Sequence, residues 1–131
     1  FRQVQSHNPY NHGEFIDHFC SGDLLFEPGS AFRYSNAGYT ILGRILELVS
    51  GQSYWQLLEK QILVPLDMKE TGFADDEQVI KGLVSGYDTT LEGFKHADFI
   101  DMTVPFSAGA MYSTVLDMYK WDRALYTDKL L

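Results

Sequence analysis

The chain has 131 residues, a length typical of one domain that buries about two-thirds of the surface its unfolded form exposes. Hydrophobic residues make up 45% and charged residues 21%, which excludes a disordered or fibrous protein. The net charge is −8, with 18 Asp and Glu against 10 Lys and Arg, and this argues against nucleic acids and anionic membranes as partners.

Apolar runs stay well below the roughly 20 residues of a membrane span. Cys20 is the single cysteine, so an internal disulfide is excluded, and we expect its thiol to be a small buried hydrophobe. The chain opens on Phe1 without an initiating Met and closes on Leu130-Leu131. We therefore expect it to be a piece of a longer protein.

Phe15, Ile16 and Phe19 recur at helical spacing and predict a short helix over 12–21. In Glu27-Pro28-Gly29-Ser30, Pro suits the second position of a turn and Gly the positive φ of the third. A type II turn is therefore predicted there. Residues 32–34 then read as a short extended segment.

An amphipathic helix is predicted over 37–50, with a capping Ser35 or Asn36 and a left-handed stop at Gly51. The pattern predicts a wide buried face and an opposite polar stripe of Thr40, Arg44 and Glu47. The residues assigned to the buried face are Ala37, Ile41, Leu42, Ile45, Leu46, Leu48 and Val49.

A second helix is predicted after it, because Ser53 and Gln56 form a Ser-x-x-Gln capping box. Pro65 is expected to force Val64 out of helical conformation and to end this helix. The two helices together are expected to form a helical hairpin.

Three further elements are predicted. Asp75-Asp76-Glu77 is typical of a solvated acidic helix start. Residues 86–99 indicate a small β-hairpin with Gly93 at its turn. A last helix begins after Ser113 or Thr114, behind the small-residue run 107–110, where backbone can approach a neighbour closely. The expected class is mainly α, with a minor β component.

The triplet Tyr34-Ser35-Asn36 is the strongest candidate for chemistry. In an extended segment, residues two apart point to the same side, so Tyr34 and Asn36 are expected to face one space. The positive end of the following helix favours an anion or developing oxyanion there. For the triplet alone, the simpler alternative is a helix cap beside a half-buried tyrosine.

The surrounding sequence resembles serine hydrolases of the class C β-lactamase and D-alanyl-D-alanine carboxypeptidase group, including their esterase-like relatives. The first matching block is PGSAFRYSNAGYTILGRILELVSGQSYWQLLEKQILVPLDMKETGF, residues 28–73. The second is SAGAMYSTVLDMYKWDRAL, residues 107–125, a small-residue run followed by a capped helix with a Lys-Trp pair. With the spacer between them, the resemblance covers nearly three-quarters of the chain.

The resemblance implies roles for the triplet, because Tyr-x-Asn is the second of three active-site motifs in that group. Tyr34 would be the proton-transfer residue, Asn36 would hold the partner Lys and the substrate amide or ester, and Ser35 would be structural. A phenol is a poor base at neutral pH without a nearby cation. Either Tyr34 is the base beside the Lys of the first motif, or that Lys is the base and Tyr34 a shuttle.

The first motif, Ser-x-x-Lys, and the third, Lys-Thr-Gly or His-x-Gly, do not occur in these 131 residues. The resemblance therefore implies that residues 1–131 are one helical subdomain of a larger two-domain β-lactamase/transpeptidase-like fold, inactive alone and partnered by a missing α/β domain. The implied substrate is a β-lactam, a D-Ala-D-Ala peptide or an ester. No cofactor or metal is implied, and the implied location is the bacterial periplasm or exterior.

Three alternative interpretations of the sequence are possible. A metal site at His7, His12, His18 and Cys20 has spacing unlike structural zinc sites. A serine hydrolase complete within the chain lacks a Gly-x-Ser-x-Gly elbow. A non-catalytic binding module derived from this fold is the strongest alternative. Finding Ser-x-x-Lys upstream and Lys-Thr-Gly or His-x-Gly downstream in the gene would favour the enzyme, and their absence would favour the binding module.

Overall fold

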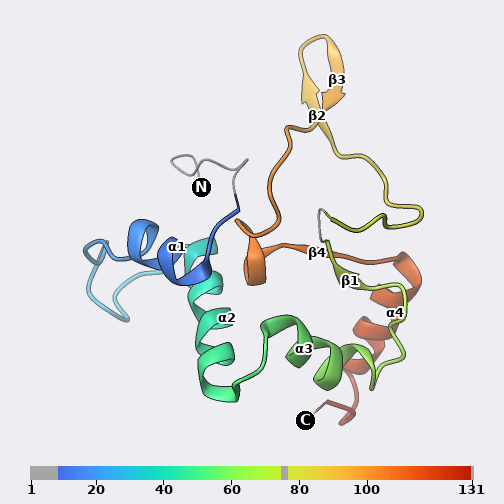
Figure 1. Ribbon diagram of the computed structural model, residues 1–131, viewed down its shortest axis with the longest axis horizontal. Helices are drawn as coiled ribbons and strands as arrows, with labels where there is room; N and C mark the ends of the chain where they lie inside the picture. The colour runs from blue at the N-terminus through green and yellow to red at the C-terminus, as the bar shows by residue number, and fades with distance from the viewer. Residues whose placement is uncertain (1–8, 75–76, 131) are drawn as a thin grey trace.

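The computed structural model describes residues 9–74 and 77–130 and is mostly helical (Figure 1). Its α-helices are α1 (His12–Phe19), α2 (Asn36–Ser50), α3 (Tyr54–Leu58) and α4 (Val115–Ala124), joined by the π-helix η1 (Glu59–Leu63) and the 3-10 helix η2 (Phe106–Ala108). The strands are β1 (Gly72–Phe73), β2 (Tyr87–Thr90), β3 (Gly93–His96) and β4 (Met111–Tyr112). The predicted class, mainly α with a short β-hairpin, is confirmed, and β1 and β4 form a second strand pair.

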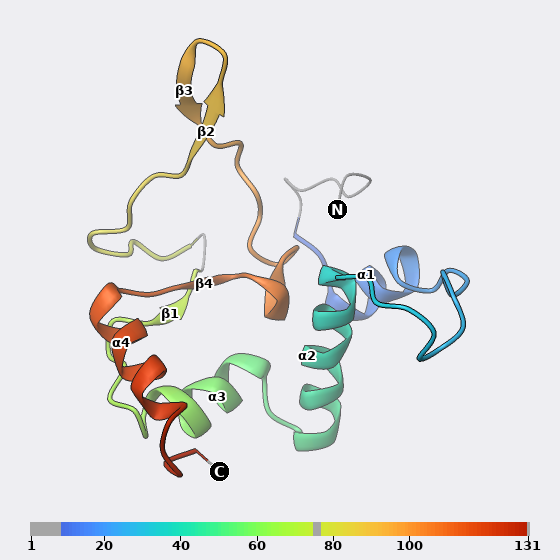
Figure 2. The ribbon, with the colours of Figure 1, turned by 180° about the vertical axis from the view of Figure 1, so that it is seen from behind.

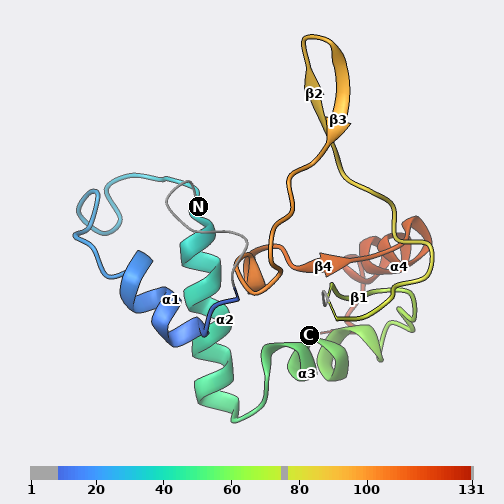
Figure 3. The same ribbon diagram turned by 45° about the horizontal axis from the view of Figure 1, so that its top comes forward.

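The elements form two helical groups, seen from the front in Figure 1 and from behind in Figure 2. Helices α1 and α2 lie on one side, while α3, η1 and α4 lie on the other. Strands β1 and β4 pair antiparallel between the groups, with Gly72 opposite Tyr112. The hairpin of β2 and β3 projects away from both groups, as Figure 3 also shows.

One hydrophobic core lies between η1 and α4. Its buried members are Leu63, Leu66, Met68 and Ala124, and the partly buried Trp55, Leu58, Ile62, Trp121 and Leu130 pack against them. Helix α1 contacts η2 through the His12 ring, which stacks on Phe106, and Phe15, Val104 and Phe106 are buried. None of the helices in the described residues is long and apolar enough to cross a bilayer.

Most predicted local signals are confirmed. Ser30 N donates to Glu27 O at 3.0 Å and Gly29 has φ +82°, as a type II turn requires. Ser53 and Gln56 form the reciprocal capping box that begins α3. The β2–β3 hairpin turns at residues 91–92, and Gly93 follows with φ +126°.

The second helix ends before Pro65, at Leu63, as predicted, but the expected non-helical conformation of Val64 is wrong. Val64 keeps helical dihedrals, φ −65° and ψ −50°, although Pro65 follows it. The chain widens into the π-helix η1, where Val64 N donates to Glu59 O, and this wider turn accommodates the proline ring. Residues 64–67 then form a turn, in which Asp67 has a left-handed φ of +57°.

The expected helical hairpin and acidic helix start are also wrong. Helix α3 leads away from α2 instead of returning along it (Figures 1 and 3), and Tyr54 N donates to Glu47 Oε1 at 3.0 Å across the bend. Asp75 and Asp76 lie outside the described residues, and residues 77–86 contain no helix. Cys20, expected to be buried, is only half-buried.

The predicted faces of α2 are reversed. Thr40, Gly43 and Glu47 lie on the side that packs against α1, η2 and α3, and Thr40 is 1% exposed. Five of the seven residues assigned to the buried face are instead largely exposed: Leu42, Ile45, Leu46, Leu48 and Val49. Small and polar residues allow η2 to approach α2 closely, so the described chain packs on that side and leaves the apolar side uncovered.

Candidate active site

The triplet Tyr34-Ser35-Asn36 lies at the start of α2, and its geometry follows from the cap. Ser35 is extended, with φ −142° and ψ 114°, and its Oγ accepts from Gly38 N at 3.2 Å. The extended Ser35 places its two neighbours on one side of the chain. Tyr34 Oη donates to Asn36 Oδ1 at 2.8 Å. The expectation that these two side chains face one space is confirmed.

The pair lies on an open surface. Tyr34 is 62% exposed, and its ring contacts the ring of Tyr39 at a centroid distance of 5.9 Å. Asn36 is half-buried, and its backbone carbonyl accepts from Thr40 Oγ1 at 3.2 Å. The phenol is thus fixed by one hydrogen bond and one aromatic contact while its outer side stays accessible.

The start of α2 is electrostatically positive. Its first turn contains no acidic residue, so the partial charge of its N–H groups is not neutralised by a neighbouring side chain. With the phenol bonded to Oδ1 of Asn36, the Nδ2 group has no acceptor among the described residues. While the phenol donates to Asn36, the site can therefore offer an amide donor and a positive helix end to a carbonyl group or an anion.

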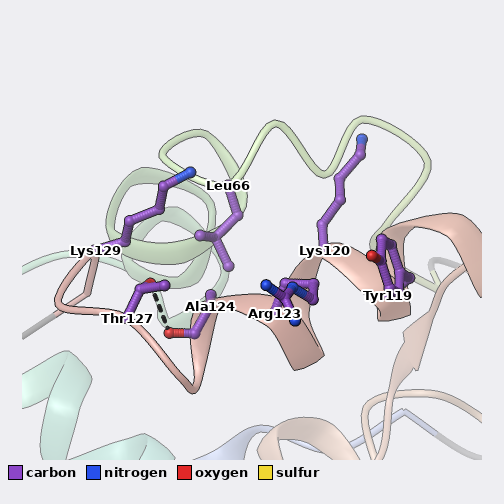
Figure 4. A pocket seen from close by; sticks show the side chains of 7 residues that line it. All are labelled: Leu66, Tyr119, Lys120, Arg123, Ala124, Thr127 and Lys129. Carbon is purple, nitrogen blue, oxygen red and sulfur yellow. Dashed lines mark hydrogen bonds between the residues drawn. The ribbon is translucent and has the colours of Figure 1, made fainter.

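A hollow of about 320 Å³ lies beside α4 and is not lined by Tyr34 or Asn36 (Figure 4). It is lined by Leu66, Tyr119, Lys120, Arg123, Ala124, Thr127 and Lys129. Lys120 is already engaged, since its ammonium contacts Asp117 Oδ1 at 2.9 Å and the backbone oxygen of Asp67. Cations near the end of α4 are explained by the negative end of the helix dipole.

Asp117, a residue that the sequence analysis did not single out, anchors α4 to the segment that follows η1. It is 2% exposed and its Oδ2 accepts from Glu70 N at 2.7 Å and Thr71 Oγ1 at 3.0 Å. Burial alone raises the pKa of Asp117, but hydrogen bonds from Lys120, Glu70 and Thr71 outweigh it and hold the pKa below its ordinary value. This ionised carboxylate is a structural link between two segments.

The candidate metal donors do not come together. The His12 ring stacks on Phe106 at 3.5 Å, and the His18 ring contacts Phe19. His7 lies outside the described residues. Within residues 9–74 and 77–130, no three His, Cys, Asp or Glu side chains are grouped as metal ligands.

Comparison with known proteins assigns the family. The family model described as Beta-lactamase matches residues 4–131, almost the whole chain. The chain belongs to the beta-lactamase family. The fold of this family member is therefore the β-lactamase/transpeptidase-like fold of serine hydrolases, as the resemblance implied.

The relatives of this beta-lactamase family member come from mammals and bacteria. The human "Serine beta-lactamase-like protein LACTB, mitochondrial" is 33% identical over 108 residues, which is 82% of this chain and 20% of that protein. The "Putative penicillin-binding protein PbpX" of Bacillus subtilis is 32% identical over 106 residues, 79% of this chain and 26% of that protein.

Solved structures agree with this assignment. The D-amino acid amidase from Ochrobactrum anthropi SV3 has a TM-score of 0.84 at 26% identity, covering 96% of this chain and 39% of that one. A penicillin-binding protein from Bacillus halodurans has a TM-score of 0.77 at 29% identity, covering 92% and 37%. The chain thus spans well under half the length of these relatives.

Proposed function

We propose that residues 1–131 are the central, mostly helical part of a β-lactamase-like serine hydrolase in which Tyr34 and Asn36 belong to the active site. One observation carries this proposal: the hydrogen bond from Tyr34 to Asn36, held on an accessible surface at the start of α2. A structural tyrosine would be expected to bury its hydroxyl against a backbone partner. The Tyr34 hydroxyl instead bonds a side-chain amide, on a tyrosine that is 62% exposed.

The proposed reaction is acyl transfer to a serine. A serine oxygen attacks the substrate carbonyl, its proton passes to the Tyr–Lys system, and the leaving nitrogen or oxygen takes a proton as its bond to the carbonyl breaks. Water then hydrolyses the acyl-enzyme. Tyr34 is the proton-transfer residue in this scheme, and Asn36 orients the Lys and the substrate amide or ester.

The nucleophilic serine, its lysine and the third motif are proposed to come from sequence outside residues 1–131. The relatives are roughly two and a half to five times as long as the aligned segment, which leaves room for them. The exposed apolar face of α2, including Leu42, Leu46 and Val49, is the surface we propose that the remainder of the same protein covers. Alone, the chain is proposed to be inactive.

Acylation tests this proposal directly. The protein expressed from its complete gene is incubated with a labelled penicillin and with a p-nitrophenyl ester, and the rates are compared with those of Tyr34→Phe. Tyr119→Phe is the matched control, because Tyr119 is 63% exposed against 62% for Tyr34. We expect Tyr34→Phe to lower at least one rate by about 100-fold, the scale of general acid–base catalysis.

Equal rates for Tyr34→Phe and the wild type on every substrate that reacts would show that Tyr34 takes no part in the mechanism. The substrate is proposed only as a class: an activated carbonyl in a β-lactam, a peptide, an amide or an ester. The amidase among the solved structures makes a D-amino acid amide worth including in the panel.

A non-catalytic binding module is the alternative function, favoured by the extent of exposed apolar surface on α2. A complete gene without Ser-x-x-Lys, combined with no acylation by any of these substrates, would favour it. For location we propose export from a bacterial cell. The LACTB relatives are named as mitochondrial, so the family occurs in more than one compartment.

A further inference from the structure

The helix η2 packs directly on the first turns of α2, behind the Tyr34–Asn36 pair. Ser107 Oγ donates to the backbone oxygen of Tyr39 at 2.8 Å, a contact between residues 68 positions apart. Gly43, one helical turn further along α2, makes this approach possible. A Cβ added to Gly43 would overlap the Ser107 side chain and lie 3.0 Å from Phe106 Cε1.

Phe106 holds η2 in this position at a conformational cost. It is 5% exposed and has φ +40°, a left-handed value that bulky residues rarely adopt. Its ring stacks on His12 of α1 at 3.5 Å and meets Tyr54 of α3 edge-on at 5.4 Å. Strained residues persist where the surroundings fix them from several sides, which is often at functional sites.

We propose that Ser107 is a positioning residue for the Tyr34–Asn36 pair and acts through the backbone of Tyr39. Gly43 permits the close approach of η2 to α2 on which this contact depends. This inference depends on the proposed function. The Ser107 bond holds the α2 segment at Tyr39, the residue whose ring contacts Tyr34 at 5.9 Å. Loss of the bond removes this link between Tyr39 and η2 and allows the phenol to shift relative to the reacting atoms.

The test uses the protein from its complete gene and three variants: Ser107→Ala, Gly43→Ala and the control Ser50→Ala. Ser50 is a matched control because its Oγ also donates to a helix carbonyl, that of Leu46, near the other end of α2. Misplacement of a catalytic group by about 1 Å can cost about 100-fold in rate, so we expect roughly a tenfold loss of kcat for Ser107→Ala and more for Gly43→Ala. Ser50→Ala should stay within about twofold of the wild type.

A double-mutant cycle separates positioning from a general loss of structure. If Ser107 acts through the phenol, adding Ser107→Ala to Tyr34→Phe should lower kcat little further, so the effects of the two substitutions should not add. Tyr34→Phe should remove one limb of the pH profile of kcat, and Ser107→Ala should alter that same limb.

Two results would overturn the inference. One is a Ser107→Ala rate equal to that of Ser50→Ala in a protein where Tyr34→Phe is strongly impaired. The other is full additivity of Ser107→Ala and Tyr34→Phe. A protein in which Tyr34→Phe itself has no effect would refute the proposed function instead, so the two failures are distinguishable.

Discussion

Tyr34 donates its phenolic hydrogen to the carboxamide oxygen of Asn36, over 2.8 Å, at the first residue of α2. This bond fixes the amide so that its oxygen faces the phenol and its Nδ2 group is turned away. If Tyr34 is the base, the phenol must first lose its own proton, and the amide would then present Nδ2 to the phenolate oxygen. The arrangement in the structure is the one that belongs to the protonated phenol.

Replacing Asn36 tests the value of that amide. We expect Asn36→Ala to lower kcat/KM by about 100-fold, the typical cost of removing one polar group that stabilises a transition state. Asn11→Ala is the control, because Asn11 caps α1 through Gly13 N and should cost only about 1 kcal/mol of stability. Steady-state kinetics of both variants measure this. Comparable losses for the two would contradict a role for Asn36 in the site.

Asp117 is expected to dominate the stability of the α4 attachment. Asp117→Asn removes the charge that Lys120 pairs with and leaves a buried amide facing three donors, so we expect a loss of about 2–4 kcal/mol. Asp122→Asn, on the exposed side of the same helix, should stay within about 0.5 kcal/mol. Urea unfolding of the complete protein measures both, and equal midpoints would contradict this role.

The same carboxylate predicts a response to acid. The pKa of Asp117 is lower in the folded chain than its unfolded value of 3.8, so its stabilisation is fully present above that value. It is lost as the pH falls through the folded pKa. Between pH 5 and pH 2 the wild type should therefore lose more stability than Asp117→Asn. Parallel pH dependences for the two proteins would show that Asp117 is not the group that titrates.

His12 predicts a dependence nearer neutrality. Burial against Phe106 lowers the pKa of His12 from 6.5; Glu47 opposes this, and Arg44 adds to it. Because the folded chain binds this proton less readily than the unfolded chain, stability is fully present above pH 6.5 and declines as the pH falls below it. His12→Phe keeps the ring contact without the charge. Unfolding at pH 8 and pH 5.5 should show a smaller difference in the variant.

The exposed face of α2 predicts a contact with the rest of the protein. In the complete protein, Leu42→Lys should destabilise by about 2 kcal/mol or more, because it places a charge where an apolar surface is buried. Leu91→Lys at the tip of the β2–β3 hairpin, where Leu91 is fully exposed, should be nearly neutral. Equal effects of the two substitutions would mean that nothing covers this face of α2.

The local elements were predictable because each depends on neighbours in the sequence. The type II turn at Gly29, the Ser35 cap and the Ser53–Gln56 capping box are fixed by residues three or four apart. The hydrogen bond between Tyr34 and Asn36 also follows from a local rule, since an extended residue separates them.

The faces of α2 were not predictable, because periodicity identifies residues on one side of a helix but not the neighbour that covers them. Gly43 is buried against Ser107 and Phe106 of η2, which lie more than 60 residues away in sequence. Asp117 was missed for the same reason: its donors Glu70 and Thr71 come from a distant segment. Val64 keeps helical dihedrals before Pro65, although a proline ring usually clashes with a helical residue that precedes it. The wider turn of the π-helix η1 relieves that clash.

The most direct measurement is the identity of the acylated residue. The protein from its complete gene is treated with a labelled β-lactam or ester, digested, and mapped by mass spectrometry, with Tyr34→Phe treated in parallel. The account predicts one modified serine, outside residues 1–131 and followed three positions later by a lysine, acylated far more slowly in Tyr34→Phe. Acylation of a serine within residues 1–131, or equal rates in both proteins, would contradict it.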